Sequence, residues 1–270
     1  MKGTKGVERL VEIVADGLKP QRSAAAYQLY WIIRDGEGAS PDKRRAMKYL
    51  RVAAENGLPE AMAQLGWHYD TGTFVGRNIV KAIDWYRKAA DKGDAWAQVD
   101  LGQIYLDGER GVNKDYIQAV RLFRKAVRKN DELAFFNLGL CYDFGKGVRQ
   151  SDRLACKFYS KAALRGHVAA MCNLGAILVD YEGSQRDGIL WTRRAALRGD
   201  DKAQHNLGEW YANGECGLKK SRRLALKWLK MSAGNGNKKA AKSLARLTAL
   251  QLKAPTQKSC LKRKRKETTK

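Results

Sequence analysis

The stretch AQVDLGQIYLDGERGV, residues 97–112, contains glycines in two different settings. Gly102 stands within a run that otherwise has the residue types of a helix, where glycine costs roughly 1 kcal/mol relative to alanine. Gly108 and Gly111 then interrupt the chain. Leu-Gly pairs at 65–66, 101–102, 138–139, 174–175 and 207–208 repeat the phrase at intervals of 36, 37, 36 and 33 residues, and Leu29-Tyr30 extends the series backwards. A period of this size predicts a stack of small supersecondary units rather than one globular core.

The second half of each unit repeats as well. Small residues recur at Ala46, Ala82, Ala119, Ala155, Gly188 and Ala225, with an aromatic or large apolar residue three positions later and a small residue seven positions later. This spacing forms one face of an α-helix. Residues suited to cap the start of these helices are Asp42, Asn78, Asp115, Ser151, Ser184 and Ser221. Residues suited to the left-handed stop after them are Gly57, Gly93, Asn130, Gly166, Gly199 and Gly236.

Each unit is therefore expected to form helix A, which contains the Leu-Gly pair, then a short glycine loop and helix B. The glycine inside helix A lets helix B lie close against it, as do the alanines expected to face it, which is packing rather than chemistry. We predict an all-α fold, a right-handed α-solenoid of six helical hairpins over residues 24–236. Residues 1–23 are expected to hold an N-terminal capping helix around Val7–Val14, and residues 237–253 a basic C-terminal capping helix over Lys238–Leu252. Residues 254–270 are expected to be a disordered basic tail.

These residues resemble the Sel1-like repeat, a relative of the tetratricopeptide repeat. The segment AFFNLGLCYDFGKGV, residues 134–148, followed by LACKFYSKAALRG, residues 154–166, is similar to the family pattern almost throughout. The resemblance covers about residues 24 to 236 in six units. It implies a helical solenoid, whereas a function carried over from the family rests on analogy alone.

The chain departs from the family pattern in two places. Its fifth unit is shortened, lacks the glycine after helix A and begins helix B at Gly188. Secreted members with disulfides place one cysteine in the Ala-Ala position and another in the next helix A. Cys172 occupies the second of these positions, but Ala162 and Ala163 occupy the first. The resemblance therefore implies no such disulfide here.

The composition indicates an intracellular chain with a strong excess of positive charge. No apolar run is long enough to cross a bilayer, and Glu8, Glu12 and Asp16 stand where a signal peptide would be apolar. Five cysteines without framework spacing favour a reducing compartment. The net charge is +24, and residues 136–270 contribute most of it, with 29 Lys and Arg against 10 Asp and Glu.

The positive charge is densest near the C-terminus. Basic residues of the last hairpin and the helix after it are Lys219, Lys220, Arg222, Arg223, Lys227, Lys230, Lys238, Lys239, Lys242 and Arg246. The run Lys262, Arg263, Lys264, Arg265 and Lys266 is a candidate nuclear-import sequence or nucleic-acid contact, and the plain alternative is a solubilising tail. A cationic end attracts any polyanion in a salt-dependent way without choosing among them.

The chain shows no pattern typical of catalysis. Its three histidines, His68, His167 and His205, form no His-x-x-x-His pair, and no Cys-x-x-Cys is present. The loop FGKGV lacks the glycine spacing and preceding strand of a phosphate-binding loop. Cys141 and Cys156 are expected to fill small gaps in the core. We expect no enzyme activity, no metal and no cofactor.

Helix A is expected to line the inner surface of the solenoid, where a partner would bind. The residue before each leucine forms a column of Gln64, Asp100, Asn137, Asn173 and Asn206. Stacked amides can hold an extended peptide by its backbone, since each offers a donor and an acceptor, or they can bridge neighbouring helices. Further candidates around this column are Trp67, Trp96, Gln103, Phe136, His205 and Glu209. The repeat core leaves Trp67 and Trp96 unexplained, so they are interface candidates, although Trp96 could instead stack between two units.

Two functions from different classes follow from these patterns. The first is a non-enzymatic interaction scaffold or adaptor that binds a peptide or helix of another protein on its concave face. The second is a polyanion-associated protein that uses its basic C-terminal end on DNA or RNA, in a nucleus or the particle of a large DNA virus. The KRKRK run favours the nucleus and the remainder of the chain fits the cytoplasm equally well.

Overall fold

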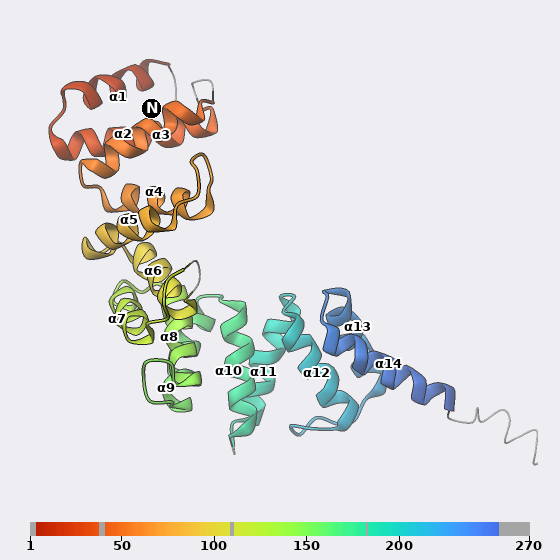
Figure 1. The fold of residues 1–270 in the computed structure, drawn as a ribbon. Coiled ribbons are helices and arrows are strands. Elements are labelled where there is room, and N and C mark those ends of the chain that lie inside the picture. The colour runs from red at the N-terminus through yellow and green to blue at the C-terminus, as the bar shows by residue number, and fades with distance from the viewer. Residues whose placement is uncertain (1–3, 38–40, 109–110, 182, 254–270) are drawn as a thin grey trace, which may run out of the picture. The chain divides into compact units, whose positions relative to one another are not determined.

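The computed structural model describes residues 4–37, 41–108, 111–181 and 183–253, with side chains up to residue 249. The described part folds into fourteen helices and no strand (Figure 1). They are α1 (Thr4–Asp16), α2 (Lys19–Asp35), α3 (Lys43–Glu55), α4 (Pro59–Thr71), α5 (Ile79–Asp91), α6 (Ala95–Asp107), α7 (Tyr116–Val127), α8 (Glu132–Phe144), α9 (Asp152–Leu164), α10 (Val168–Asp180), α11 (Gln185–Leu197), α12 (Asp201–Asn213), α13 (Arg222–Gly234) and α14 (Lys238–Lys253). The all-α hairpin architecture predicted from the sequence is confirmed.

The chain divides into two compact units, residues 1–155 and residues 156–270. In the first unit α2 packs on α3, α4 on α5 and α6 on α7, and α1 packs on α2. In the second unit α10 packs on α11, α12 on α13 and α14 on α13. Helix α1 spans residues 4–16, and the first helix of the repeat region, α2, begins at Lys19. The basic run at Lys262–Lys266 lies outside the described residues.

Local sequence chemistry explains most helix ends. Asp42, Asn78 and Asp115 accept hydrogen bonds from first-turn amides with their side chains, and the hydroxyls of Ser151 and Ser221 do the same at 3.3 and 3.4 Å. The six predicted stops all have positive φ: Gly57, Gly93, Asn130, Gly166, Gly199 and Gly236. The prediction for Ser184 is wrong. Its backbone has φ −106° and ψ 1° rather than an extended conformation, and its side chain makes no cap hydrogen bond.

The glycine within helix A provides close helix packing, as predicted, but its partner is larger than the alanines we expected to face it. A Cβ on Gly102 would lie 2.6 Å from Cε1 of Phe123, and one on Gly66 would lie 2.9 Å from Cδ1 of Tyr86. Both rings are fully buried. Tyr86 and Phe123 stand four positions after the repeated small residues Ala82 and Ala119 of helix B. The sequence pattern had singled out the large residue three positions after each of these alanines. Glycine is therefore required because an aromatic side chain of helix B rests on the backbone of helix A.

The shortened fifth unit uses a different contact. Gly175 of α10 faces Gly188 of α11, and a Cβ on Gly175 would lie 2.8 Å from the Gly188 carbonyl oxygen and 2.2 Å from Oγ1 of Thr192. The family pattern has alanine at the position of Gly188. Glycine there lets the backbones of α10 and α11 come into contact.

A repeated side-chain contact joins consecutive hairpins. Arginines near the middle of helix B donate to tyrosine hydroxyls on the following helix A, eighteen residues later: Arg87 to Tyr105 at 3.4 Å, Arg124 to Tyr142 at 3.1 Å and Arg193 to Tyr211 at 2.9 Å. The tyrosines stand four residues after the repeated leucine, and each has an arginine eighteen residues before it, whereas the unit with Leu178 has Ser160 at that position. The sequence analysis did not identify this contact, although the fixed separation was available as a pattern.

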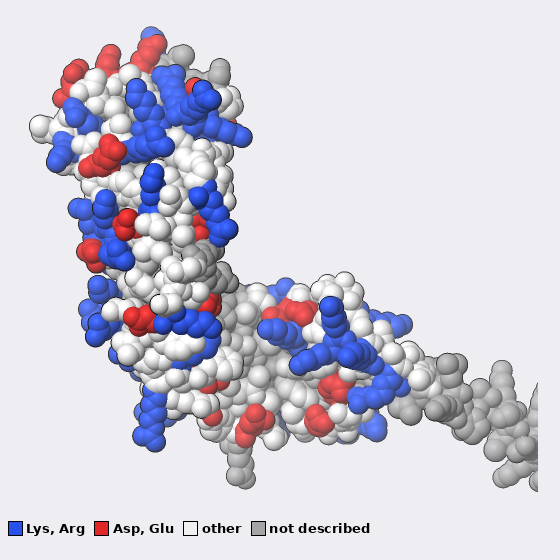
Figure 2. All heavy atoms as spheres, in the orientation of Figure 1, with Lys and Arg blue, Asp and Glu red and all other residues white. Residues whose placement is uncertain are grey.

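Lys and Arg side chains are spread over both units on the face drawn in Figure 2. In the last hairpin and α14 the basic residues named above are all solvent-exposed. None of the helices in the described part of the chain has the length and apolarity that a membrane crossing requires.

Candidate protein-binding grooves

The amide column predicted on helix A is not uniform. Asn137 is 3% exposed and Gln64 is 8% exposed, whereas Asp100, Asn173 and Asn206 are half-buried. The first two side chains therefore have little surface to offer a partner. The other three keep part of their side-chain surface exposed to solvent.

Asn137 connects neighbouring helices. Its Nδ2 donates to Oε1 of Gln103 at 3.2 Å, which links α8 to α6. At this position the bond therefore supports a bridge between neighbouring helices rather than an amide that holds a peptide. Gln103, another predicted groove residue, remains solvent-exposed at the other end of this bond.

We expect Asn137→Ala to lower the free energy of unfolding by roughly 1 kcal/mol, because the variant loses a hydrogen bond and leaves the Gln103 amide short of a partner. The measurement is urea unfolding of the variant beside wild type. Asn206→Ala, at the equivalent but half-buried position, is the matched control and should change stability much less. Equal losses of stability in both variants would contradict a structural role for Asn137 that Asn206 does not share.

A second set of amides, two positions closer to the N-terminus of helix A, is purely structural. Nε2 of Gln98 donates to the Ala90 carbonyl and Nε2 of Gln204 to the Ala196 carbonyl, both at 3.0 Å. Both glutamines are almost fully buried. They add a second hydrogen bond to carbonyls at the C-terminal end of the preceding helix B, which also accept from the amides of Gly93 and Gly199. The sequence analysis did not identify this role, because Met62 occupies the same position in another repeat.

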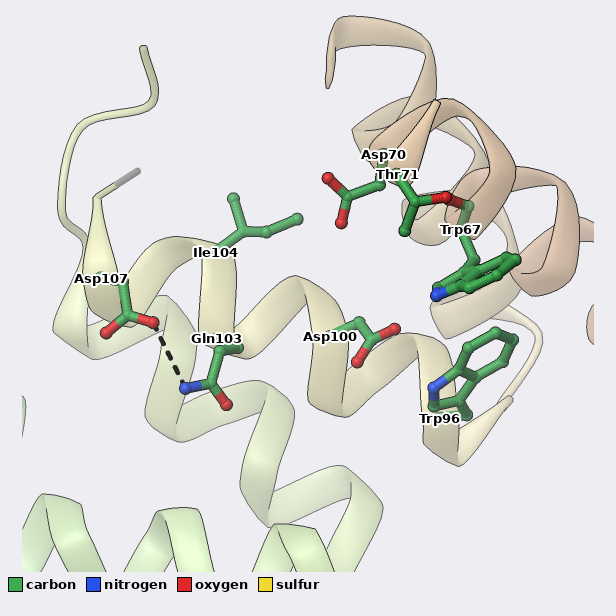
Figure 3. Close-up of a pocket in the computed structure, with 8 residues that line it drawn as sticks. All are labelled: Trp67, Asp70, Thr71, Trp96, Asp100, Gln103, Ile104 and Asp107. Atoms are coloured by element: carbon green, nitrogen blue, oxygen red, sulfur yellow. Dashed lines mark hydrogen bonds between the residues drawn. The ribbon is translucent and has the colours of Figure 1, made fainter. Parts of the chain in front are cut away.

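The first unit contains a pocket of about 310 Å³ between α4 and α6 (Figure 3). Its lining consists of Trp67, Asp70, Thr71, Trp96, Asp100, Gln103, Ile104 and Asp107. Four of these eight, Trp67, Trp96, Asp100 and Gln103, were predicted groove residues. The other four were not singled out, although they follow Trp67 and Asp100 at the helical spacings of three, four and seven.

His68 fixes the helix that presents Trp67. Its Nδ1 lies 2.7 Å from the Thr73 carbonyl oxygen, which can only accept, so Nδ1 carries the proton. Nε2 then accepts from the Tyr30 hydroxyl at 2.8 Å. The ring also meets Phe74 face to face, with centroids 5.1 Å apart. Burial lowers the pKa of His68 below its usual range, which keeps the ring neutral.

Acidification should therefore destabilise the first unit through His68. Its pKa is lower in the folded chain than the value of about 6.5 expected when unfolded, so the unfolded state takes up the proton first. The stability from this group is complete above about pH 6.5 and is lost as the pH falls below it. Melting temperatures of wild type and His68→Gln at neutral and mildly acidic pH check this. The pH-dependent drop should be smaller in the variant, and an equal drop would contradict the assignment.

The second unit contains a pocket of about 550 Å³ at the meeting of α10, α12 and the start of α14. It brings together the predicted residues Asn173, His205 and Asn206. Lys202, Lys238 and Lys239 also line it, so its lining has an excess of basic side chains. Asp201 is engaged by Nδ2 of Asn237 at 2.8 Å.

The remaining predicted groove residues lie elsewhere. Oε2 of Glu209 accepts from Arg246 of α14 at 2.9 Å, so this carboxylate joins the last helix to the stack. Phe136 is half-buried on α8 and lines neither pocket.

The described residues offer little for covalent or metal chemistry. Burial raises the pKa of the Cys141 thiol to about 11 and that of the Cys172 thiol to about 12, so neither forms an appreciable thiolate at neutral pH. No three or more His, Cys, Asp or Glu side chains of the described part are grouped to hold a metal ion. His167 serves as a helix cap, with Nδ1 accepting from the Ala170 amide at 3.2 Å.

Helical hairpins that pack one on the next define a helical-repeat protein. Residues 23–58, 59–94, 97–131, 133–167 and 201–237 each match the family model of the Sel1 repeat, and the chain belongs to this family. These segments leave out the shortened hairpin of α10 and α11, which the structure nevertheless contains.

The chain is similar to proteins named as regulators. It is 29% identical over 238 residues to chitin synthase regulator SKT5 of Saccharomyces cerevisiae, covering 82% of this chain and 34% of that protein. It is 28% identical to chitin synthase regulatory factor 3 of Schizosaccharomyces pombe, covering 75% of this chain and 23% of that protein. The chain thus spans a third or less of the length of these relatives.

The fold is similar to solved Sel1 repeat structures. One is a protective antigen present in uropathogenic Escherichia coli strains, with an SLR fold, a TM-score of 0.77 and 27% identity, covering 90% of this chain and 56% of that one. Another is a Sel1 repeat protein from Oxalobacter formigenes, with a TM-score of 0.68 and 28% identity, covering 84% of this chain and 99% of that one. Proteins of the Sel1 repeat family mediate protein–protein interactions.

Proposed function

We propose that this chain is a non-enzymatic scaffold that binds an extended peptide or helix of a partner protein along its helix A surfaces. The observation that supports this best is that predicted groove residues gather in two pockets, one in each unit. Repeat proteins typically bind partners on such extended surfaces, and paired tryptophans are strong interface formers. The regulator names of the two yeast relatives fit an adaptor role.

The half-buried amides of the second unit supply the first test. Asn173→Ala/Asn206→Ala should weaken capture of the physiological partner by roughly thirtyfold, because the two amides contribute about 1 kcal/mol net each. Pull-downs with the immobilised full chain, quantified by mass spectrometry, measure the recovery. Arg223→Ala, an exposed substitution on α13, is the matched control and should leave recovery unchanged.

Thermal melting of the same variants separates binding from folding. Both should melt close to wild type, because none of the three side chains is fully buried. A folded Asn173→Ala/Asn206→Ala variant with unchanged recovery would overturn the proposal for this unit. Binding would then have to use helix B or the basic end of the chain.

The polyanion alternative has no comparable support. Its most basic segment lies outside the described residues, and the relatives reported above are not named for nucleic-acid binding. A nuclear location remains a prediction from the KRKRK run, and a virion location remains a prediction for the case of a viral source.

A further inference from the structure

The pocket in the second unit is bordered by three helices that follow one another in the stack. Residues of α10, α12 and the start of α14 line it, and α14 packs against both α12 and α13. Its volume of about 550 Å³ lies within the range of pockets that hold a ligand. All of these helices belong to one compact unit, so packing within that unit forms the pocket.

The charged side chains of this pocket are unbalanced. Lys202, Lys238 and Lys239 contribute three positive charges, and Asp201 is the acidic member of the lining. Oδ2 of Asp201 accepts from Nδ2 of Asn237 at 2.8 Å, so this carboxylate already joins α12 to the residue that precedes α14. Within the part of the chain that the structure describes, no side chain forms an ion pair with any of the three lysines. The pocket therefore has an excess of positive charge that no described carboxylate neutralises.

Lysine side chains, and not the end of a helix, supply the groups that attract an anion here. The amides of Lys239 and Ala240, in the first turn of α14, already donate to Oδ1 of Asn237 at 3.0 Å. The three lysine side chains are solvent-exposed, and an ammonium group on a flexible stem can turn toward an incoming anion. An anion in this pocket is therefore held by the lysines that border it.

Two amides stand beside these charges. Asn173 of α10 and Asn206 of α12 line the same pocket, occupy equivalent positions of successive repeats and are half-buried. Each carboxamide offers a donor and an acceptor, which suits the C=O and N–H groups of a peptide backbone. The phosphate groups of a nucleic acid only accept, so they would leave the amide oxygens unused. The pair of amides therefore favours an acidic peptide over a nucleic acid as the occupant.

We propose that this pocket binds an acidic segment of the partner protein, with Asp or Glu carboxylates beside the three lysines and the backbone on the two asparagine amides. This inference rests on the scaffold function proposed above and adds the chemistry of the partner. The pocket between α4 and α6 has three aspartates and neither Lys nor Arg in its lining, so the same segment is not expected to bind there.

Two matched peptides test the charge of the occupant. The probes are fluorescent Gly-Ser peptides that contain either two adjacent glutamates or two adjacent glutamines, titrated into the full-length chain by fluorescence anisotropy. Glutamine keeps the size of glutamate and removes its charge. We expect the glutamate peptide to bind at least about tenfold more tightly than the glutamine peptide, and this preference should shrink as the salt concentration rises.

Two variants assign the roles of the lining residues. Lys202→Gln/Lys238→Gln/Lys239→Gln should remove most of the preference for glutamate and leave the affinity of the glutamine peptide nearly unchanged. Asn173→Ala/Asn206→Ala should instead weaken both peptides by a similar factor, because the amides hold the backbone that the two peptides share.

A third variant separates the pocket from the overall charge of the chain. Lys219→Gln/Lys220→Gln/Lys230→Gln removes the same number of charges from exposed lysines of the second unit that do not line the pocket. It should keep nearly the whole preference for glutamate. Melting curves should show both triple variants folded as wild type is, because all of the substituted side chains are solvent-exposed.

Three outcomes would overturn this inference. The glutamine peptide could bind as tightly as the glutamate peptide, or the pocket variant could keep as much of the glutamate preference as the control variant does. Alternatively, a single-stranded oligonucleotide could lose affinity in the pocket variant and not in the control, which would assign the pocket to nucleic acid. Any of these results, with partner capture still dependent on Asn173 and Asn206, would leave the scaffold proposal standing.

Discussion

Gly175→Ala should destabilise the second unit by about 1–3 kcal/mol, although alanine is the better helix former. Its Cβ would lie 2.8 Å from the Gly188 carbonyl oxygen and 2.8 Å from the Thr192 backbone nitrogen. These are backbone atoms, so the contact is relieved only if α10 and α11 move apart. Gly175→Leu should cost more, because the whole side chain must enter the same space. Urea unfolding followed by far-UV circular dichroism measures both changes.

Gly234→Ala is the matched control for this prediction. Gly234 ends α13, and a Cβ there would meet no atom within 4 Å. This substitution should be neutral or should stabilise by up to about 1 kcal/mol. If Gly175→Ala and Gly234→Ala had the same effect, helix propensity rather than close packing would explain the glycine in helix A.

The repeat architecture could be predicted because its information is local. A cap such as Asp42, a stop such as Gly93 and the period of the Leu-Gly pairs each depend on a few consecutive residues. The prediction failed at Ser184, where the shortened loop changes the backbone angles and leaves a suitable residue type in an unsuitable conformation. The partner of the helix A glycine was also misjudged. Periodicity gives the face of helix B but does not decide which residue on it reaches across.

The candidate site was predicted only in part, for a related reason. Trp67 and Trp96 stood out because the repeat core gives them no role. Asp70 and Asp107 were overlooked, since a single aspartate at the end of a helix is ordinary until its neighbour across the groove is known. The contact of Glu209 with Arg246 spans 37 residues and depends on where α14 packs. No pattern within one repeat contains that information.

Phe123→Ala should lower the free energy of unfolding by about 3–5 kcal/mol, the usual cost of removing a buried aromatic ring. Phe123 is fully buried, and its ring lies against the backbone of Gly102 in α6. Glycine cannot fill the space that the ring leaves, so the cavity should collapse only partly. Thermal and urea unfolding of the full chain measure the loss.

Phe144→Ala is the matched control in the same unit, because Phe144 ends α8 with 64% of its surface exposed. It should change stability by no more than about 0.5 kcal/mol. Phe123 does not line the pocket between α4 and α6, whereas Asp100 and Gln103 stand on either side of Gly102 on the helix that Phe123 supports. Below its lowered melting temperature, Phe123→Ala should therefore still capture the partner protein nearly as wild type does. A large loss of affinity in the folded variant would mean that the ring holds α6 in its binding position, and stability and recognition would then share one residue.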